Sequence, residues 1–170
     1  IYLKSCWSPC FWHANVRDGS IAVGIYSIGI SICLITYTIY VLNGGDTSQL
    51  WLPFFETDMK SGTLQGSGGV TICYFMVLIL LSILLLVGVR KEIRGLMLPW
   101  LYTSNVAILF QIMYGLWMVF GYYIYLEMVF AALCNWTWMG LNIYCIWVVK
   151  SHLRNVERKQ SPDIEYYNDV

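Results

Sequence analysis

The chain has 170 residues, of which 58% are hydrophobic and only 12% are charged, and its formal net charge is zero. Soluble domains carry about 25% charged residues, so a chain of this composition cannot hide its apolar surface from water, and a lipid bilayer must be part of its solvent. The absence of a net positive charge also argues against nucleic acid as a partner.

The first segment, residues 1–19, is expected to be a cytoplasmic juxtamembrane segment. It contains Cys6 and Cys10 within the stretch KSCWSPCFWH. Thiols next to a membrane and among aromatic residues are candidates for reversible palmitoylation, and simple free thiols are the alternative. No disulfide framework is expected, because the other cysteines lie in or near apolar runs and these two lie on the reducing side.

Four segments are long and apolar enough to be membrane-spanning helices, each of which needs about 20 residues. The last two come from residues 95–149, a stretch that contains Glu127 as its one charge and is too long for a single helix. We expect Pro99 in the first turn of the third helix, where a missing N–H costs little. The predicted fold is an all-α integral membrane protein, a four-transmembrane-helix bundle with spans at 20–42, 70–89, 96–120 and 126–149.

The distribution of lysine and arginine predicts the orientation of these spans. Nine of the ten basic residues lie in segment 1–19, in the turn 90–95 and in the tail 150–170, whereas the loop 43–69 contains only Lys60. Basic residues accumulate on the cytoplasmic side of membrane proteins. Both termini and the turn 90–95 are therefore predicted to be cytoplasmic, and the loop 43–69 and the short turn 121–125 extracellular or lumenal.

The outer loop 43–69 has Gly- and Ser-rich ends and an apolar, aromatic centre, LWLPFFETDM. This centre could pack on the ends of the helices or lie in the membrane interface. Alternatively it is a contact surface for a partner, because an exposed patch of this kind is unusual without one. The candidate contact residues are Trp51, Leu52, Phe54 and Phe55.

The polar residues inside the spans are amides and hydroxyls, and no acidic or basic residue lies deep in a span. Hydrogen bonds between helices are the simpler interpretation, and the lining of a transport path is the alternative. The amides concerned are Asn105, Gln111, Asn135 and Asn142. Asn135 also begins a glycosylation sequon, which we expect to be unmodified because it lies within the fourth span.

Small residues recur in the first span at Ser20 and Gly24 and at Ser27 and Ser31. Pairs of small residues four positions apart let two helices approach closely. Packing within the bundle is the simpler interpretation, and an interface between copies of the chain is the alternative.

The tail 150–170 begins as a basic extension of the fourth helix and ends in SPDIEYYNDV. Its last four residues fit a Tyr-x-x-apolar pattern, with Tyr167 and Val170 at the two defining positions. Clathrin adaptors bind such peptides as an extended strand with two side-chain pockets. The tail is therefore a candidate sorting signal with a clathrin adaptor as a possible partner.

Residues for catalysis are scarce. The two histidines, His13 and His152, lie in juxtamembrane segments with no Cys or carboxylate at metal-ligand spacing, and there is no Gly-rich phosphate loop. The sequence therefore predicts neither an enzyme nor a bound cofactor or metal.

The layout resembles a known group of small four-span proteins. A start that contains Cys10 leads into an Arg-x-Gly motif, Val16-Arg17-Asp18-Gly19. A basic turn, Arg90-Lys91-Glu92-Ile93-Arg94, leads into an apolar-Pro-aromatic motif, Leu98-Pro99-Trp100. A tail that contains Tyr167 ends the chain. It is similar to the insect pasiflora-like family and, more distantly, to the lysosome-associated four-span transmembrane proteins, although it lacks the PPxY motifs of the latter. The resemblance implies a protein without enzymatic activity, acting at occluding junctions of the plasma membrane or, as the lysosomal members do, in trafficking.

The expected function is that of an accessory, assembly or junction component that binds other integral membrane proteins through its spans and outer loop. Those partners would form a larger complex with it, or it would form a homo-oligomer. The plasma membrane is favoured over endosomes and lysosomes. The alternatives are a small-molecule or ion transporter lined by the four amides and a dedicated auxiliary subunit of one channel or receptor.

Overall fold

The computed structural model describes residues 15–45, 61–122 and 126–160, and it contains helices and no strand within them. The helices are α1 (Val16–Leu42), α2 (Ser61–Lys91), α3 (Arg94–Tyr122) and α4 (Leu126–Gln160). All four are long and apolar enough to cross a membrane. The prediction of an all-helical chain with four potential spans is therefore confirmed.

The helices extend past the apolar segments that hydropathy marks. α2 begins at Ser61, inside the segment predicted as the outer loop, and α4 continues to Gln160. The expectation for Pro99 is wrong, because α3 begins at Arg94 and the proline is its sixth residue rather than part of its first turn. Hydropathy locates the part of a helix that suits lipid, whereas the backbone can remain helical well beyond that part.

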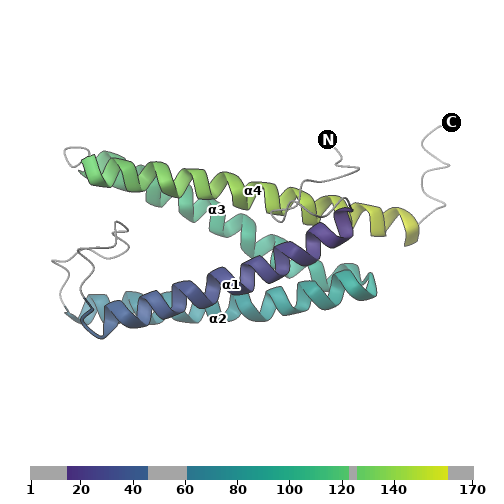
Figure 1. Cartoon of the computed structure of the whole chain (residues 1–170), viewed down its shortest axis with the longest axis horizontal. Coiled ribbons are helices and arrows are strands. Elements are labelled where there is room, and N and C mark those ends of the chain that lie inside the picture. Colours follow the sequence, from purple (N-terminus) through teal and green to yellow (C-terminus); the bar gives the residue numbers. More distant parts are fainter. Residues whose placement is uncertain (1–14, 46–60, 123–125, 161–170) are drawn as a thin grey trace.

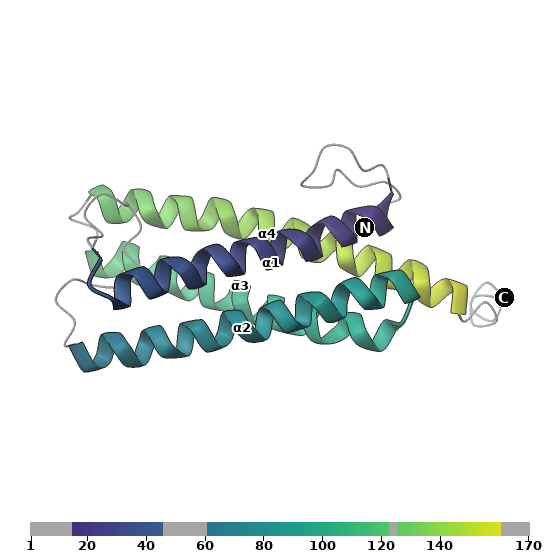
Figure 2. The ribbon, with the colours of Figure 1, turned by 60° about the horizontal axis from the view of Figure 1, so that its bottom comes forward.

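The helices run alternately up and down and form a ring in which α1 packs on α2, α2 on α3, α3 on α4 and α4 on α1 (Figure 1, Figure 2). We call the end where α1 begins, α2 joins α3 and α4 ends the basic end, because Arg17, Arg90, Lys91 and Arg94 lie there. The other end is the opposite end. α4 projects past the other helices at the basic end (Figure 1).

The buried apolar side chains are distributed unequally between the two halves. The larger cluster lies in the basic half and takes residues from all four helices, among them Val23, Leu85, Trp100 and Val149. The smaller cluster lies in the opposite half and is centred on Met118, Ala131 and Ala132 of α3 and α4. The four helices therefore share one core in the basic half, and at the opposite end the pair α1–α2 stands apart from the pair α3–α4 (Figure 1).

Glycines mark the points where two helices come closest. A side chain at Gly24 of α1 would collide with Leu86 of α2, and one at Gly115 of α3 would collide with the indole of Trp136 of α4. Ser20 and Ser31 are fully buried, and each donates a hydrogen bond to a carbonyl of the preceding turn of α1. The small residues of the first span that are buried therefore serve packing within the bundle.

Candidate functional site

The turn between α2 and α3 is a tight cap in which one residue has left-handed backbone geometry. Glu92 has a φ of 55°, and the amide of Ile93 donates a hydrogen bond of 2.9 Å to the carbonyl of Gly88. This pattern is the Schellman type of helix end, whose left-handed position is usually glycine. A residue with a Cβ is disfavoured there, so contacts to the rest of the chain must hold Glu92 in place.

The projecting end of α4 supplies those contacts. Lys159 Nζ donates to Glu92 Oε1 at 3.1 Å, and Gln160 Nε2 donates to the carbonyl of Glu92 at 2.9 Å. Arg94, the first residue of α3, forms an ion pair of 2.5 Å with Glu157. Exposed ion pairs stabilise a fold little by themselves, so their main effect is to fix the turn against α4.

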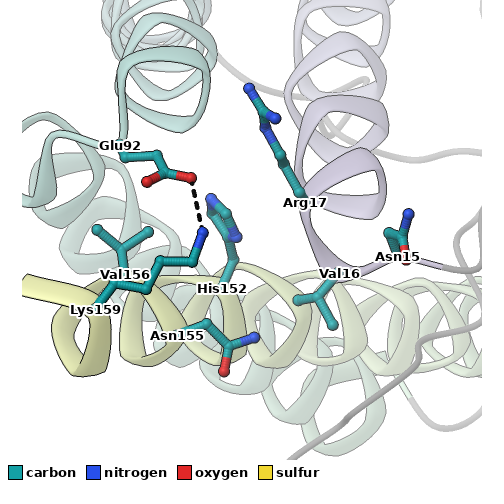
Figure 3. A pocket seen from close by; sticks show the side chains of 8 residues that line it. All are labelled: Asn15, Val16, Arg17, Glu92, His152, Asn155, Val156 and Lys159. Carbon is teal, nitrogen blue, oxygen red and sulfur yellow. Dashed lines mark hydrogen bonds and ion pairs between the residues drawn. The ribbon is translucent and has the colours of Figure 1, made fainter.

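The first turn of α1 completes a pocket at the basic end. Arg17 Nη2 donates to the carbonyl of Arg90 at 3.5 Å, which brings the start of α1 next to the turn. The pocket has a volume of about 250 Å³ and is open to the outside (Figure 3). Its walls come from α1, from the α2–α3 turn and from α4, namely Asn15, Val16, Arg17, Glu92, His152, Asn155, Val156 and Lys159.

His152 is the most deeply placed polar side chain of this pocket. Only 5% of its surface is exposed, and its Nε2 atom is buried with no hydrogen-bond partner. The ring lies between Glu92 and Arg17 and points toward the space between them (Figure 3). A buried donor or acceptor without a partner costs about 1–3 kcal/mol, so this atom is poised to bind a group that enters the pocket.

The pKa values of two groups in the pocket are shifted in the same direction for different reasons. Burial is the main cause that lowers the pKa of His152, Glu92 acts against it, and Arg17 and Lys159 lower it further. The pKa of Glu92 is lowered chiefly by its hydrogen bond from Lys159 and by the charge of that lysine. At neutral pH the pocket therefore contains a neutral imidazole, one carboxylate and two cations.

A second polar group lies inside the helices, at the α3–α4 contact. Asn135 Nδ2 donates to the carbonyl of Gln111 at 3.0 Å, and Asn142 Nδ2 donates to Gln111 Oε1 at 3.3 Å. Asn105 instead donates to Leu101 of its own helix at 2.7 Å. Gln111 is thus the shared partner of two asparagines, and three of the four predicted amides connect α3 to α4.

One further hydrogen bond links α4 to α1 within the apolar region. Trp138 Nε1 donates to the hydroxyl of Tyr26 at 2.7 Å. Together with the amides of α3 and α4, it makes a band of polar contacts between the shared core and the opposite end. Each of these contacts joins two protein groups, which is the usual role of polar side chains in a membrane bundle.

Several predicted site residues lie outside the described residues: Cys6 and Cys10, the loop residues Trp51, Leu52, Phe54 and Phe55, and the tail residues Tyr167 and Val170. Sequence reasoning did not anticipate the pocket. His152, Val156 and Lys159 are spaced to share one face of a helix, which was the available signal. That face becomes a site only because Arg17 and Glu92 are brought to it by the fold.

Within the three described ranges, no group of three or more His, Cys, Asp or Glu side chains could hold a metal ion. The polar groups of the pocket are donors for the most part, and they suit an anionic ligand better than a cation. Comparisons with models of protein families, with curated proteins and with solved structures found no match to this chain.

Proposed function

We propose that this protein is a non-enzymatic, four-pass membrane protein that assembles with other integral membrane proteins. Both of its termini and the basic end face the cytoplasm in this proposal, in agreement with the positive-inside distribution of its lysines and arginines. The plasma membrane and its cell junctions are the proposed location. The family resemblance described above motivates that location.

The observation that carries the proposal is the presence of small residues on the exposed surfaces of α1 and α4. Gly29 of α1 and Gly140 of α4 are exposed, and an added side chain at either position would meet nothing within 4 Å. Cys33, one turn after Gly29, is exposed as well. In a membrane, helices associate where small residues allow their backbones to approach, and large apolar residues suffice for contact with lipid.

The neighbouring exposed positions show the contrast. Large apolar side chains cover most of the outer surface of the described helices, as at Ile25, Ile32, Phe110 and Met113. These side chains suit lipid. Gly29 lies between Ile25 and Ile32 on the same face of α1, so it forms a gap between large side chains into which a helix of another protein can pack. Gly140 leaves such a gap on α4, and the loop residues Trp51, Phe54 and Phe55 are the proposed second contact.

The engagement of the intramembrane amides supports this function over transport. Gln111, Asn135 and Asn142 bond to protein groups rather than facing an open path. A transporter that relied on these residues would have to break those bonds in each cycle. The auxiliary-subunit alternative is a special case of the proposed assembly with a single, large partner.

Quantitative co-purification from native membranes in nanodiscs tests the proposal. The full chain is compared with a variant that carries Gly29→Leu and Gly140→Leu and with a variant that carries Trp51→Ala, Phe54→Ala and Phe55→Ala. Val106→Leu is the matched control, because it adds bulk at an exposed position of α3 that is already large. We expect the wild type and the control to retain a stoichiometric set of membrane proteins that at least one of the two variants loses.

The outcomes separate the alternatives. Loss in the glycine variant places the contact on the helices, and loss in the loop variant places it in the outer loop. Co-purification of differently tagged copies of this chain alone would identify a homo-oligomer. If no membrane protein is retained in stoichiometric amount, the assembly function is wrong, and substrate flux into liposomes becomes the relevant assay.

A further inference from the structure

The pocket at the basic end combines several hydrogen-bond donors with a buried atom that has no partner. Arg17 supplies a guanidinium group, Lys159 an ammonium group and Asn155 an amide, and they come from different helices or from different turns of α4. All of them line the same pocket as His152. Convergent donors around a space of this size are typical of a binding site for a small anionic group.

The start of α1 adds a second feature that favours an anion. The first hydrogen bond within this helix runs from the amide of Gly19 to the carbonyl of Asn15 at 3.0 Å, and the three preceding amides have no carbonyl partner within the helix. Asn15 makes no capping hydrogen bond with its side chain. The partial positive charge of this helix end therefore borders the pocket on the side of Asn15 and Val16.

His152 provides the independent indication that the pocket receives a ligand. Its Nε2 atom is buried without a partner, and the ring is directed into the space that Glu92 and Arg17 border. An imidazole at this position can donate a hydrogen bond to an oxygen of an entering group. That bond would remove the cost of the unpaired atom, so binding and local stability would rise together.

Glu92 acts in this pocket as an internal competitor. Its carboxylate accepts a hydrogen bond from Lys159 at 3.1 Å, so it pairs with one of the two cations of the pocket when no ligand is bound. An entering anion would be attracted by Arg17 and Lys159 and repelled by Glu92. Single substitutions of these three charged groups should therefore change the affinity for an anion in both directions. A purely structural ion pair would not have this property.

We propose that this pocket binds a phosphate monoester, with Arg17, Lys159 and His152 as its donors and Glu92 as the carboxylate that it displaces from Lys159. Phosphate groups suit the site because their oxygens accept several charge-assisted hydrogen bonds at once. The group could belong to the headgroup of a phosphoinositide or to a soluble inositol phosphate. The position of the pocket beside the apolar helices favours the headgroup of a lipid in the cytoplasmic leaflet.

The experiment uses the full chain in phosphatidylcholine nanodiscs. In one arm, labelled phosphatidylinositol 4-phosphate is titrated into the lipid, and in the other arm inositol 1,4,5-trisphosphate is added from solution. The lipid arm rests on the membrane insertion proposed above, whereas the soluble arm does not. Binding in the lipid arm alone identifies a headgroup, and binding in the soluble arm identifies a soluble phosphate as a ligand.

Substitutions then test whether the binding is specific. Arg17→Gln is expected to weaken it by about tenfold, since a hydrogen bond to a charged group is lost. His152→Leu is expected to weaken it as well, and Glu92→Gln to strengthen it severalfold. The matched control is Lys91→Gln, which removes the same charge from an exposed position of the basic end outside the pocket and should change affinity by less than about twofold.

Three results would overturn the proposal. They are the absence of binding in both arms, an equal loss in Lys91→Gln and Arg17→Gln, and weaker binding in Glu92→Gln. Asn155→Leu provides a test that leaves all charges in place, because it removes a lining amide from an exposed position. The unfolding temperature of each variant in phosphatidylcholine alone verifies that the fold is retained.

Discussion

The basic half and the opposite half of the bundle are held together by different kinds of contact. In the basic half, residues of all four helices share one apolar core, and polar contacts of Glu92 and Glu157 tie the end of α4 to the α2–α3 turn. In the opposite half, α3 and α4 have a small core of their own, and the Gln111 amide bonds join them as a pair. The four helices are thus joined as one unit chiefly at the basic end.

The two halves suit different tasks. The shared apolar core and the polar contacts between the end of α4 and the α2–α3 turn give the basic half a fixed geometry. A pocket that is lined by donors from several helices requires such a geometry. In the opposite half the pairs α1–α2 and α3–α4 stand apart at their ends, and in the proposed function each pair presents its own surface to another membrane protein. The effects of substitutions on stability should therefore differ between the two halves, both in size and in how many helices they involve.

The largest effect is expected from Trp100→Ala in the shared core. Trp100 is 3% exposed and belongs to the cluster that joins all four helices. Removing a buried tryptophan leaves a large cavity, and we expect the free energy of unfolding to fall by about 3 kcal/mol. Unfolding in mixed micelles by titration with a denaturing detergent measures this change.

The matched control is Trp117→Ala in the same helix. Trp117 is 53% exposed, so its loss should cost no more than about 1 kcal/mol. A comparable cost for the two substitutions would mean that the buried cluster of the basic half does not hold the bundle together, and the contrast between the halves would be lost.

The part of this fold that sequence predicts well is the part that hydropathy marks. The four apolar segments are recognisable because a helix that could cross a membrane needs about 20 apolar residues, and all four helices have them. The helical start of α2 at Ser61 was missed because its Gly- and Ser-rich composition is typical of a loop. Pro99 was misplaced because the start of α3 is fixed by the cap at Glu92 rather than by hydropathy.

The candidate sites also contain residues that sequence identifies and residues that only the fold brings together. The amides of the third and fourth spans were identifiable as packing residues, but that Gln111 serves both Asn135 and Asn142 depends on the rotation of α3 against α4. His152 appeared in the sequence as an isolated histidine. Its neighbours Arg17 and Glu92 are far away in the chain, and only the packing of α1 and the α2–α3 turn on α4 assembles them.

A smaller effect, confined to the opposite half, is expected from the amide group. A double-mutant cycle of Gln111→Ala and Asn142→Ala should give a coupling of about 0.6 kcal/mol, and no more than about 1.7 kcal/mol, as hydrogen bonds between membrane helices usually do. The measurement is the free energy of unfolding of the two single variants, the double variant and the wild type in bicelles.

The control for this cycle is Asn105→Ala combined with Asn142→Ala. Asn105 bonds to its own helix, so its coupling to Asn142 should be close to zero. A coupling as large as that of the Gln111 pair would mean that the cycle reports a general loosening of α3 rather than the bond between the two helices.

The smallest effect is expected from pH and returns to the basic half. His152 has a pKa below its ordinary value of 6.5 in the folded protein, so the unfolded chain binds a proton more readily than the fold does. Stability that is present above pH 6.5 is therefore lost progressively as the pH falls through that value toward the lowered pKa. The pKa of Glu92 is lowered from 4.5, chiefly by its hydrogen bond from Lys159, so its carboxylate remains charged as the pH falls through 6.5.

His152→Gln tests this assignment, because glutamine is polar and does not titrate. We expect the wild type to lose unfolding temperature between neutral pH and a pH below 6.5, and the variant to lose less. The charged and polar groups that face the imidazole from the packed elements are Arg17, Glu92, Asn155 and Lys159. An equal loss in both proteins would assign the pH dependence to groups other than His152, and the neutral imidazole would then contribute nothing to the stability of the basic half.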